Sequence, residues 1–275
     1  MEFLYQRSWH VQVERVHDRL ISSCHYLDSF EEKSTELIVN VSDYSIQEAK
    51  LMQLGYPEHF TESTLYLDGL HGVSAYTGSG PEVRRILQPI LSAQDTELIN
   101  QCIIGAFQSE TFIYNERGFV SAEKYSQAGD EYLKGTCRYY SNLERINNSW
   151  SNYIGQPERS EYLFNRFKNQ QLMATEEEYW LIGSLSDPFH QVNTFLRLRR
   201  PDQCVIDAQG QLLKAPDQVC RESNAYLQYL AGINILQLSK KELAHRLGAQ
   251  SGCVHLIDLV YDSGETLKIY NKSRA

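Results

Sequence analysis

Residues 192–199 read VNTFLRLR, and their side chains alternate between the two faces of an extended chain. One face would carry Val192, Thr194, Leu196 and Leu198. This period of two predicts a half-buried β-strand. Pro201-Asp202 then predicts a turn into a second strand over residues 203–208, and Gln209-Gly210 predicts a further turn. The segment is therefore expected to form an antiparallel meander.

Helical patterns follow the predicted strands. Apolar residues recur at helical spacing over residues 219–233. Ser239 and Glu242 form the sequence signature of a capping box, which opens a second helix that ends at Gly248. A last helix is predicted to begin after Gly252. Strands followed by helices indicate an α+β fold.

The first half of the chain has comparable parts in the same order. Apolar strands are predicted at residues 37–41 and 65–67, a helix opens at Gly80-Pro81, and a second helical pattern covers residues 96–105. This order predicts an internal duplication. The expected fold class is α+β, with two tandem related modules, each a small antiparallel sheet packed by helices.

The boundary between the halves is predicted where residues that break regular structure accumulate. Asn147-Asn148-Ser149 and Gly155-Gln156-Pro157 are the strongest breaks. The sequence thus predicts an N-terminal module at residues 1–120, a connecting segment at residues 121–159, and a C-terminal module at residues 160–275.

The composition of the chain argues against several classes of protein. The 35 acidic and 26 basic residues give a net charge of −9, which repels a nucleic-acid backbone. No apolar run is long enough to cross a membrane, and the N-terminus does not resemble a secretion signal. Six irregularly spaced cysteines do not form a disulfide framework, so they are expected to be thiols. We therefore expect a cytoplasmic protein whose partners are another protein or a small molecule, not nucleic acid or a membrane.

The predicted C-terminal module carries side chains suited to metal binding or thiol chemistry, each at an element boundary: His190, Cys220, Cys253 and His255. Both cysteines are predicted to open helices, where the helix dipole would lower the pKa of a thiol. An ideal helix would point Cys253 and His255 about 200° apart, but an open first turn would let both reach one centre. Glu222 and Asp258 are candidates for orienting a histidine.

Two thiolates and two imidazoles would satisfy a tetrahedral Zn²⁺ or ligate iron. In the first half, the positions matching residues 252–255 read Glu110-Thr111-Phe112-Ile113. The sequence therefore predicts one site per chain, in the second half.

The residues of this site also carry a family resemblance. His190, Cys220, Leu230-Ala231-Gly232 and the sequence Gly252-Cys253-Val254-His255-Leu256 resemble the pattern of the bacterial domain-of-unknown-function family 2889. The resemblance covers His190 to Val260 and implies no activity. The arrangement is also similar, at the level of fold, to the iron–sulfur cluster scaffold proteins, which hold zinc or a nascent cluster with thiolates and a histidine. His190 stands where the scaffolds have an early cysteine, and the final cysteine and histidine are in reversed order.

Three functions follow as alternatives. The first is a metal-binding or sulfur-handling accessory or carrier protein, with Zn or Fe held by His190, Cys220, Cys253 and His255. The second is an enzyme that acts on a small molecule, either through this metal or with one cysteine as nucleophile and His255 or His190 as general base. Cys253 and His255 are the candidate catalytic residues. The third is a structural or regulatory protein that binds a partner, in which the four residues only pack. The sequence leaves open whether the protein is an enzyme.

Overall fold

The computed structural model describes residues 1–54, 62–155 and 159–274. Gln156 and Pro157, part of the predicted break, lie outside these residues. Antiparallel strands and separate helices confirm the α+β class. Contacts divide the chain into two compact units, unit 1 (residues 1–7, 123–155 and 168–275) and unit 2 (residues 8–122 and 156–167). The predicted duplication and its module boundaries stay a prediction.

Unit 2 contains a sheet and the helices that cover it. Its strands lie in the order β5-β4-β3-β2-β1, and the neighbours from β2 to β5 pair antiparallel. The elements are β1 (Glu2–Val16, which begins in unit 1), β2 (Arg19–Asp28), β3 (Glu32–Asn40), β4 (Ile46–Gln53), β5 (Ser63–Tyr66), α1 (Gly80–Leu87) and α2 (Ala93–Ser109).

Helix α2 packs on β2 and β3. Its inward face buries Leu98, Ile99 and Cys102 completely. Gly105 lies where an added Cβ would be 2.7 Å from Val11 Cγ1, so the absence of a side chain permits close packing of α2 on β1. The core of unit 2 is therefore a helix pressed onto one face of its strands.

Unit 1 contains the predicted site. Its strands lie in the order β6-β7-β8-β9, and β7, β8 and β9 pair antiparallel. The strands are β6 (Tyr162–Ala174, which begins in unit 2), β7 (Glu178–Ser186), β8 (Gln191–Arg199) and β9 (Val205–Lys214). The helices are α3 (Ala122–Tyr132), α4 (Trp150–Ile154), α5 (Gln218–Arg221), α6 (Lys240–Arg246) and α7 (Val254–Ser273).

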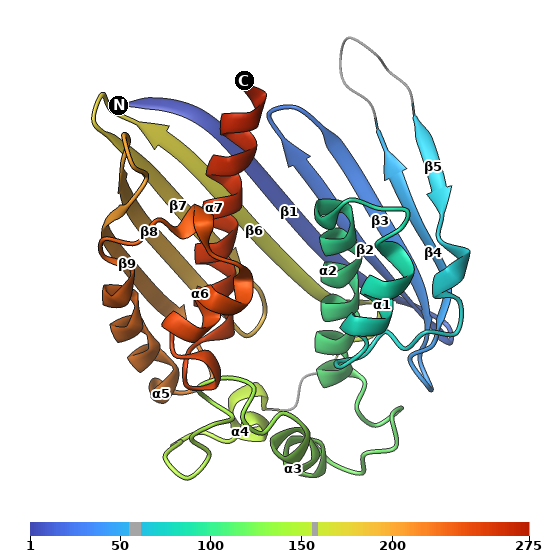
Figure 1. Cartoon of the computed structure of the whole chain (residues 1–275). Coiled ribbons are helices and arrows are strands. Elements are labelled where there is room, and N and C mark those ends of the chain that lie inside the picture. Colours follow the sequence, from blue (N-terminus) through green and yellow to red (C-terminus); the bar gives the residue numbers. More distant parts are fainter. Residues whose placement is uncertain (55–61, 156–158, 275) are drawn as a thin grey trace. The chain divides into compact units, whose positions relative to one another are not determined.

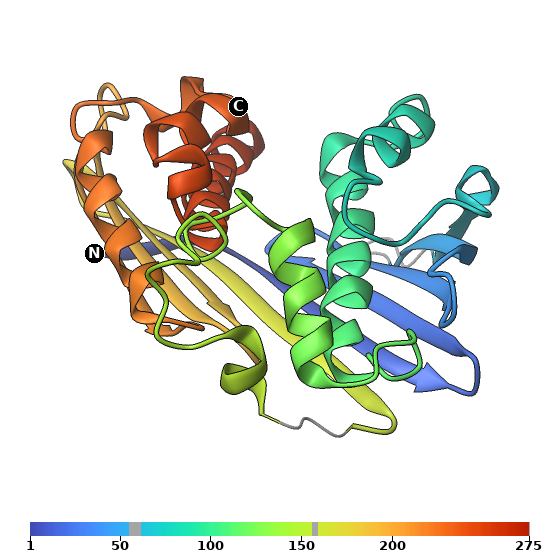
Figure 2. The same ribbon diagram turned by 90° about the horizontal axis from the view of Figure 1, so that it is seen from below.

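The long helix α7 lies against β7 and β8 (Figure 1). It buries Leu259, Val260 and Leu267 in the core of the unit. Figure 2 shows α5, α6 and α7, coloured orange to red, on one face of the strands of this unit. Because α7 is packed along its length, the position of its first residues relative to β7 and β8 is fixed. Within the part of the chain that the structure describes, no helix has the length and apolarity needed to cross a membrane.

Most of the local predictions for this unit are confirmed. The strand at residues 192–199 is β8, and the capping box of Ser239 and Glu242 opens α6 with both of its hydrogen bonds. The predicted turn at Gln209-Gly210 is wrong, because β9 continues through it and Gly210 pairs with Thr194. The predicted helix at residues 219–233 is the single turn α5 followed by a 3₁₀ segment, Glu222–Leu230.

Gly210 explains the mistaken turn. An added Cβ there would lie 2.6 Å from Leu227 Cδ1 and 3.0 Å from Leu256 Cδ2. The glycine therefore permits the 3₁₀ segment and α7 to pack closely on the strand, and its presence does not mark a change of direction.

Candidate functional site

A tight turn between β7 and β8 presents His190. The Asp187 N–H donates to the carbonyl of His190 at 2.9 Å. Asp187 Oδ1 in return accepts the backbone N–H groups of Phe189 at 2.8 Å and His190 at 2.7 Å. This Asx turn fixes the backbone at His190 through contacts within four residues.

Helix α4 and β9 support the same turn from outside. Tyr153 Oη donates to the carbonyl of Phe189 at 2.5 Å, and the rings of Trp150 and Phe189 lie 4.9 Å apart. Lys214 Nζ donates to the carbonyl of Pro188. Burial, with the negative charge of Asp187, raises the pKa of Tyr153 to about 12, so its hydroxyl stays a donor at neutral pH.

The start of α7 presents Cys253 and His255. Cys253 is the N-cap residue, with an extended backbone (φ −93°, ψ 118°), and is not part of the helix proper. Cys253 Sγ therefore lies only 4.0 Å from His255 Nδ1, despite the wide angle that an ideal helix would impose. His255 is partly buried, and the Cys253 residue is 8% exposed.

The turn and the helix start bring two histidines and a carboxylate together. The rings of His190 and His255 have centroids 4.0 Å apart, inclined by 34°. His190 Nδ1 lies 3.2 Å from Asp187 Oδ1. One ligand atom from each of Asp187, His190 and His255 falls within 4.8 Å of the others. A proton on His190 Nδ1 would be held by the carboxylate, which leaves Nε2 to bind an ion or accept a proton.

The two predicted cysteines share an apolar cluster beside this group. Cys220 and Cys253 pack with Tyr139, Val219 and Leu256, among others. Among the described residues, the close group of ligand atoms contains Asp187 and the two histidines but neither thiol. Cys253 Sγ lies 4.0 Å from His255 Nδ1 of this group, and Cys220 packs in the same apolar cluster as Cys253.

Burial decides the protonation of both thiols. It raises the pKa of Cys220 to about 11 and that of Cys253 to about 12. The predicted lowering by the helix dipole is wrong in direction, because desolvation of a charged sulfur outweighs the dipole and the nearby backbone N–H groups. Without a bound cation, both groups are neutral thiols at pH 7.

Asp187 is a residue of this candidate site that was not predicted from the sequence. Its position three residues before a histidine, with a proline between them, is the signal that could have found it. The carboxylates expected to orient a histidine have other partners: Glu222 pairs with Arg138 and Arg145, and Asp258 lies 2.8 Å from Lys240 Nζ.

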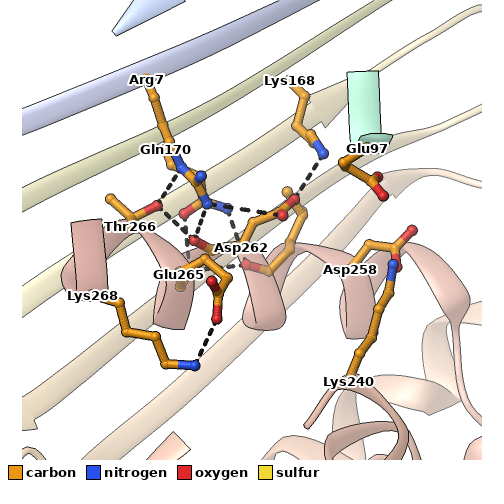
Figure 3. A network of polar contacts seen from close by, with 12 residues as sticks. Arg7, Glu97, Lys168, Gln170, Lys240, Asp258, Asp262, Glu265, Thr266 and Lys268 are labelled. Atoms are coloured by element: carbon orange, nitrogen blue, oxygen red, sulfur yellow. Dashed lines mark hydrogen bonds and ion pairs between the residues drawn. The ribbon is translucent and has the colours of Figure 1, made fainter. Parts of the chain in front are cut away.

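A buried polar network around Asp262 and Thr266 of α7 was also not predicted from the sequence. Arg7 donates from Nε to Thr266 Oγ1 at 2.8 Å and from Nη2 to the carbonyl of Asp262 at 2.6 Å. Lys168 Nζ lies 2.8 Å from Asp262 Oδ2 (Figure 3). Residues Arg7, Lys168 and Asp262 are between 3% and 8% exposed. Charged groups this deeply buried must be paired, so the network fixes α7 on β1 and β6.

The comparisons with known proteins bear on this unit. No curated protein matches the chain at a significant level. Residues 168–268, which include Asp187, His190, Cys220, Cys253 and His255, match the model of a family described as a protein of unknown function (DUF2889). This match confirms the resemblance noted for His190 to Val260, and it covers residues 168–268 of the 275 in the chain.

Proposed function

We propose that the protein is a cytoplasmic metal-binding accessory or carrier protein that binds a divalent transition-metal ion at His190 and His255. The observation that carries the proposal is the gathering of ligand atoms from Asp187, His190 and His255 within 4.8 Å. Nitrogen and oxygen ligands of a tetrahedral Zn²⁺ lie about 3.4 Å apart, given bonds of about 2.1 Å. Binding would therefore draw the three groups together by up to about 1.4 Å, which small side-chain rotations can supply.

The donor types favour zinc or iron. Two imidazoles and one carboxylate are ligands that both Zn²⁺ and Fe²⁺ accept, and they leave coordination positions open. Asp187 Oδ1 already accepts two backbone N–H groups, so its main role would be to hold His190 with Nε2 toward the ion. The six cysteines, all within the described part of the chain, form no disulfide, which is consistent with a reducing compartment.

The pKa of Cys253 and its distance from His255 argue against a role for this cysteine as a nucleophile. Burial raises the pKa of Cys253 to about 12, so its thiol is neutral at pH 7. The distance of 4.0 Å from its sulfur to His255 Nδ1 is long for efficient proton transfer. An enzymatic role would therefore depend on the metal.

Metal analysis tests the proposal. Protein purified without an affinity tag would be measured for bound metal and titrated with Zn²⁺ and Fe²⁺. We expect one ion per chain, and loss of that ion in the double variant His190→Ala, His255→Ala. His245→Ala is the matched control, because this exposed histidine lies on the neighbouring helix α6.

A conservative variant separates binding from folding. Asp187→Asn keeps the size of the side chain, and we expect it to weaken Zn²⁺ binding by about 10- to 100-fold, as loss of a residue that orients a ligand does. Far-ultraviolet circular dichroism would check that each variant is folded. Unchanged metal content in the folded double variant would refute the proposal.

A further inference from the structure

One peptide of the turn between β7 and β8 is held at both of its polar groups. This peptide joins Phe189 to His190. Its carbonyl accepts from Tyr153 Oη at 2.5 Å, and its N–H donates to Asp187 Oδ1 at 2.7 Å. The orientation of the peptide sets the φ angle of His190, and the backbone angles decide which χ1 rotamers a side chain can adopt. The two bonds therefore restrict the direction in which His190 points.

Helix α4 presents the hydroxyl of Tyr153 to this turn. The N-cap of the helix, Ser149, accepts the N–H of Asn152 through Oγ at 3.2 Å. Trp150 and Tyr153 lie three positions apart, so they share one face of the helix. The ring of Trp150 lies 4.9 Å from that of Phe189, and Trp150 is buried. An apolar contact and a hydrogen bond from one capped helix therefore act on the same residue of the turn.

Little water can reach the carbonyl that Tyr153 holds. Phe189 is 3% exposed, and a buried acceptor that loses a donor is costly because solvent cannot take the place of that donor. Without the hydroxyl, the turn should shift toward another donor, and His190 would move with it. A ligand that is already held in its bound direction also loses little conformational freedom when an ion arrives. The rigidity of this peptide should therefore raise the affinity for the ion.

We propose that Tyr153 is a positioning residue for the metal site, because it fixes the peptide that carries the ligand His190. The inference rests on the proposed function and deepens it. It places a control on the affinity of the site in α4, which lies outside residues 168–268, the part of the chain that matches the DUF2889 model. Tyr153 acts through His190, as Asp187 does from the N–H side of the same peptide.

Zinc titration of Tyr153→Phe tests the proposal. The change keeps the ring and removes the hydroxyl, and we expect it to weaken Zn²⁺ binding about tenfold, the low end for loss of a group that orients a ligand. Tyr229→Phe is the matched control, because this tyrosine of unit 1 is 56% exposed, and its affinity should stay within about twofold. Urea denaturation would verify that both variants are almost wholly folded under the titration conditions. A small loss of global stability then leaves the dissociation constant for Zn²⁺ unchanged.

A double-mutant cycle separates positioning from a general structural role. Asp187→Asn weakens the hold on the N–H of the peptide that Tyr153→Phe releases at its carbonyl. If both changes act on this peptide, the double variant should lose less affinity than the product of the two single losses. Independent structural effects would multiply, and a multiplied loss would contradict the proposal.

The results also distinguish this inference from the proposed function. Suppose that Zn²⁺ binding is lost in the His190 and His255 double variant, but folded Tyr153→Phe binds Zn²⁺ as tightly as the unaltered protein. The proposed function then stands, and the role of Tyr153 is refuted. If the unaltered protein binds no Zn²⁺, the proposed function fails and this inference fails with it. A loss of about tenfold in Tyr153→Phe, with effects that do not multiply in the cycle, supports both.

Discussion

Asp217 joins the segment Cys137–Asn148, here called the strap, to α5, and its removal should destabilise unit 1 measurably. Its Oδ1 caps α5 by accepting the Val219 N–H at 2.9 Å. Its Oδ2 accepts the N–H groups of Asn147 and Asn148. The residue is only 6% exposed, so water cannot readily replace all three bonds.

The structure sets the size of the effect for Asp217→Ala. Loss of a helix N-cap costs about 1 kcal/mol. Each of the two bonds to the strap should contribute about 1 kcal/mol, below the range of about 1.5–3 kcal/mol for bonds to charged groups, because Asn147 and Asn148 are exposed and water can reach them. We therefore expect the free energy of unfolding to fall by about 3 kcal/mol.

Urea denaturation of the full chain would measure this change. Asp217→Asn, which keeps one acceptor oxygen, should lose about half as much. The matched control is Glu144→Ala, an exposed change on the same strap that should stay within about 0.5 kcal/mol of the unaltered protein. A loss below about 1 kcal/mol for Asp217→Ala would show that the strap is not anchored as described.

The carboxylate of Asp217 also predicts the direction in which stability changes with pH. Desolvation opposes ionisation of Asp217, but hydrogen bonds from Val219, Asn147 and Asn148 outweigh it, so its pKa is lowered from 3.8. The stability it contributes is fully present above pH 3.8 and is lost as the pH falls through the lowered pKa. The difference in stability between Asp217→Ala and the unaltered protein should therefore be constant at pH values above 3.8 and shrink as the pH falls through the lowered pKa of Asp217.

Two further substitutions test the packing around α7. Gly210→Ala should reduce stability by about 1–3 kcal/mol in urea denaturation, because the new methyl group would lie 2.6 Å from Leu227 Cδ1; an unchanged midpoint would show that the leucine moves aside freely. Asp262→Ala should cost about 3–5 kcal/mol, because it removes the carboxylate paired with the buried Lys168 and Arg7. A loss under 1 kcal/mol for Asp262→Ala would mean that these cations find other partners.

Features encoded within a few residues could be predicted from the sequence. The alternation at residues 192–199 specified β8, and the Ser239–Glu242 pair specified the start of α6. Both depend on contacts between near neighbours, so the residues themselves contain the needed information. The pairing of Asp187 with His190 is equally local and could have been predicted.

Other features of the site depend on how deeply its residues are buried, which could not be predicted from the sequence alone. The positions of Cys220 and Cys253 near helix starts suggested lowered pKa values. In the structure the apolar cluster around them raises both pKa values, because desolvation is the larger effect. Gly210 likewise suggested a turn, but its neighbours Leu227 and Leu256 show that it provides space for packing.

By itself, the sequence determined the α+β class, the helix start that carries Cys253 and His255, and the residue types available for a metal. Only the tertiary structure decided which of these groups meet: the turn with Asp187 and His190 lies beside His255, and the strap with Cys137 lies on both helix starts. Local hydrogen bonds and periodicity act over a few residues. Contacts between distant segments depend on how all the elements pack together, and no single stretch of sequence contains that information.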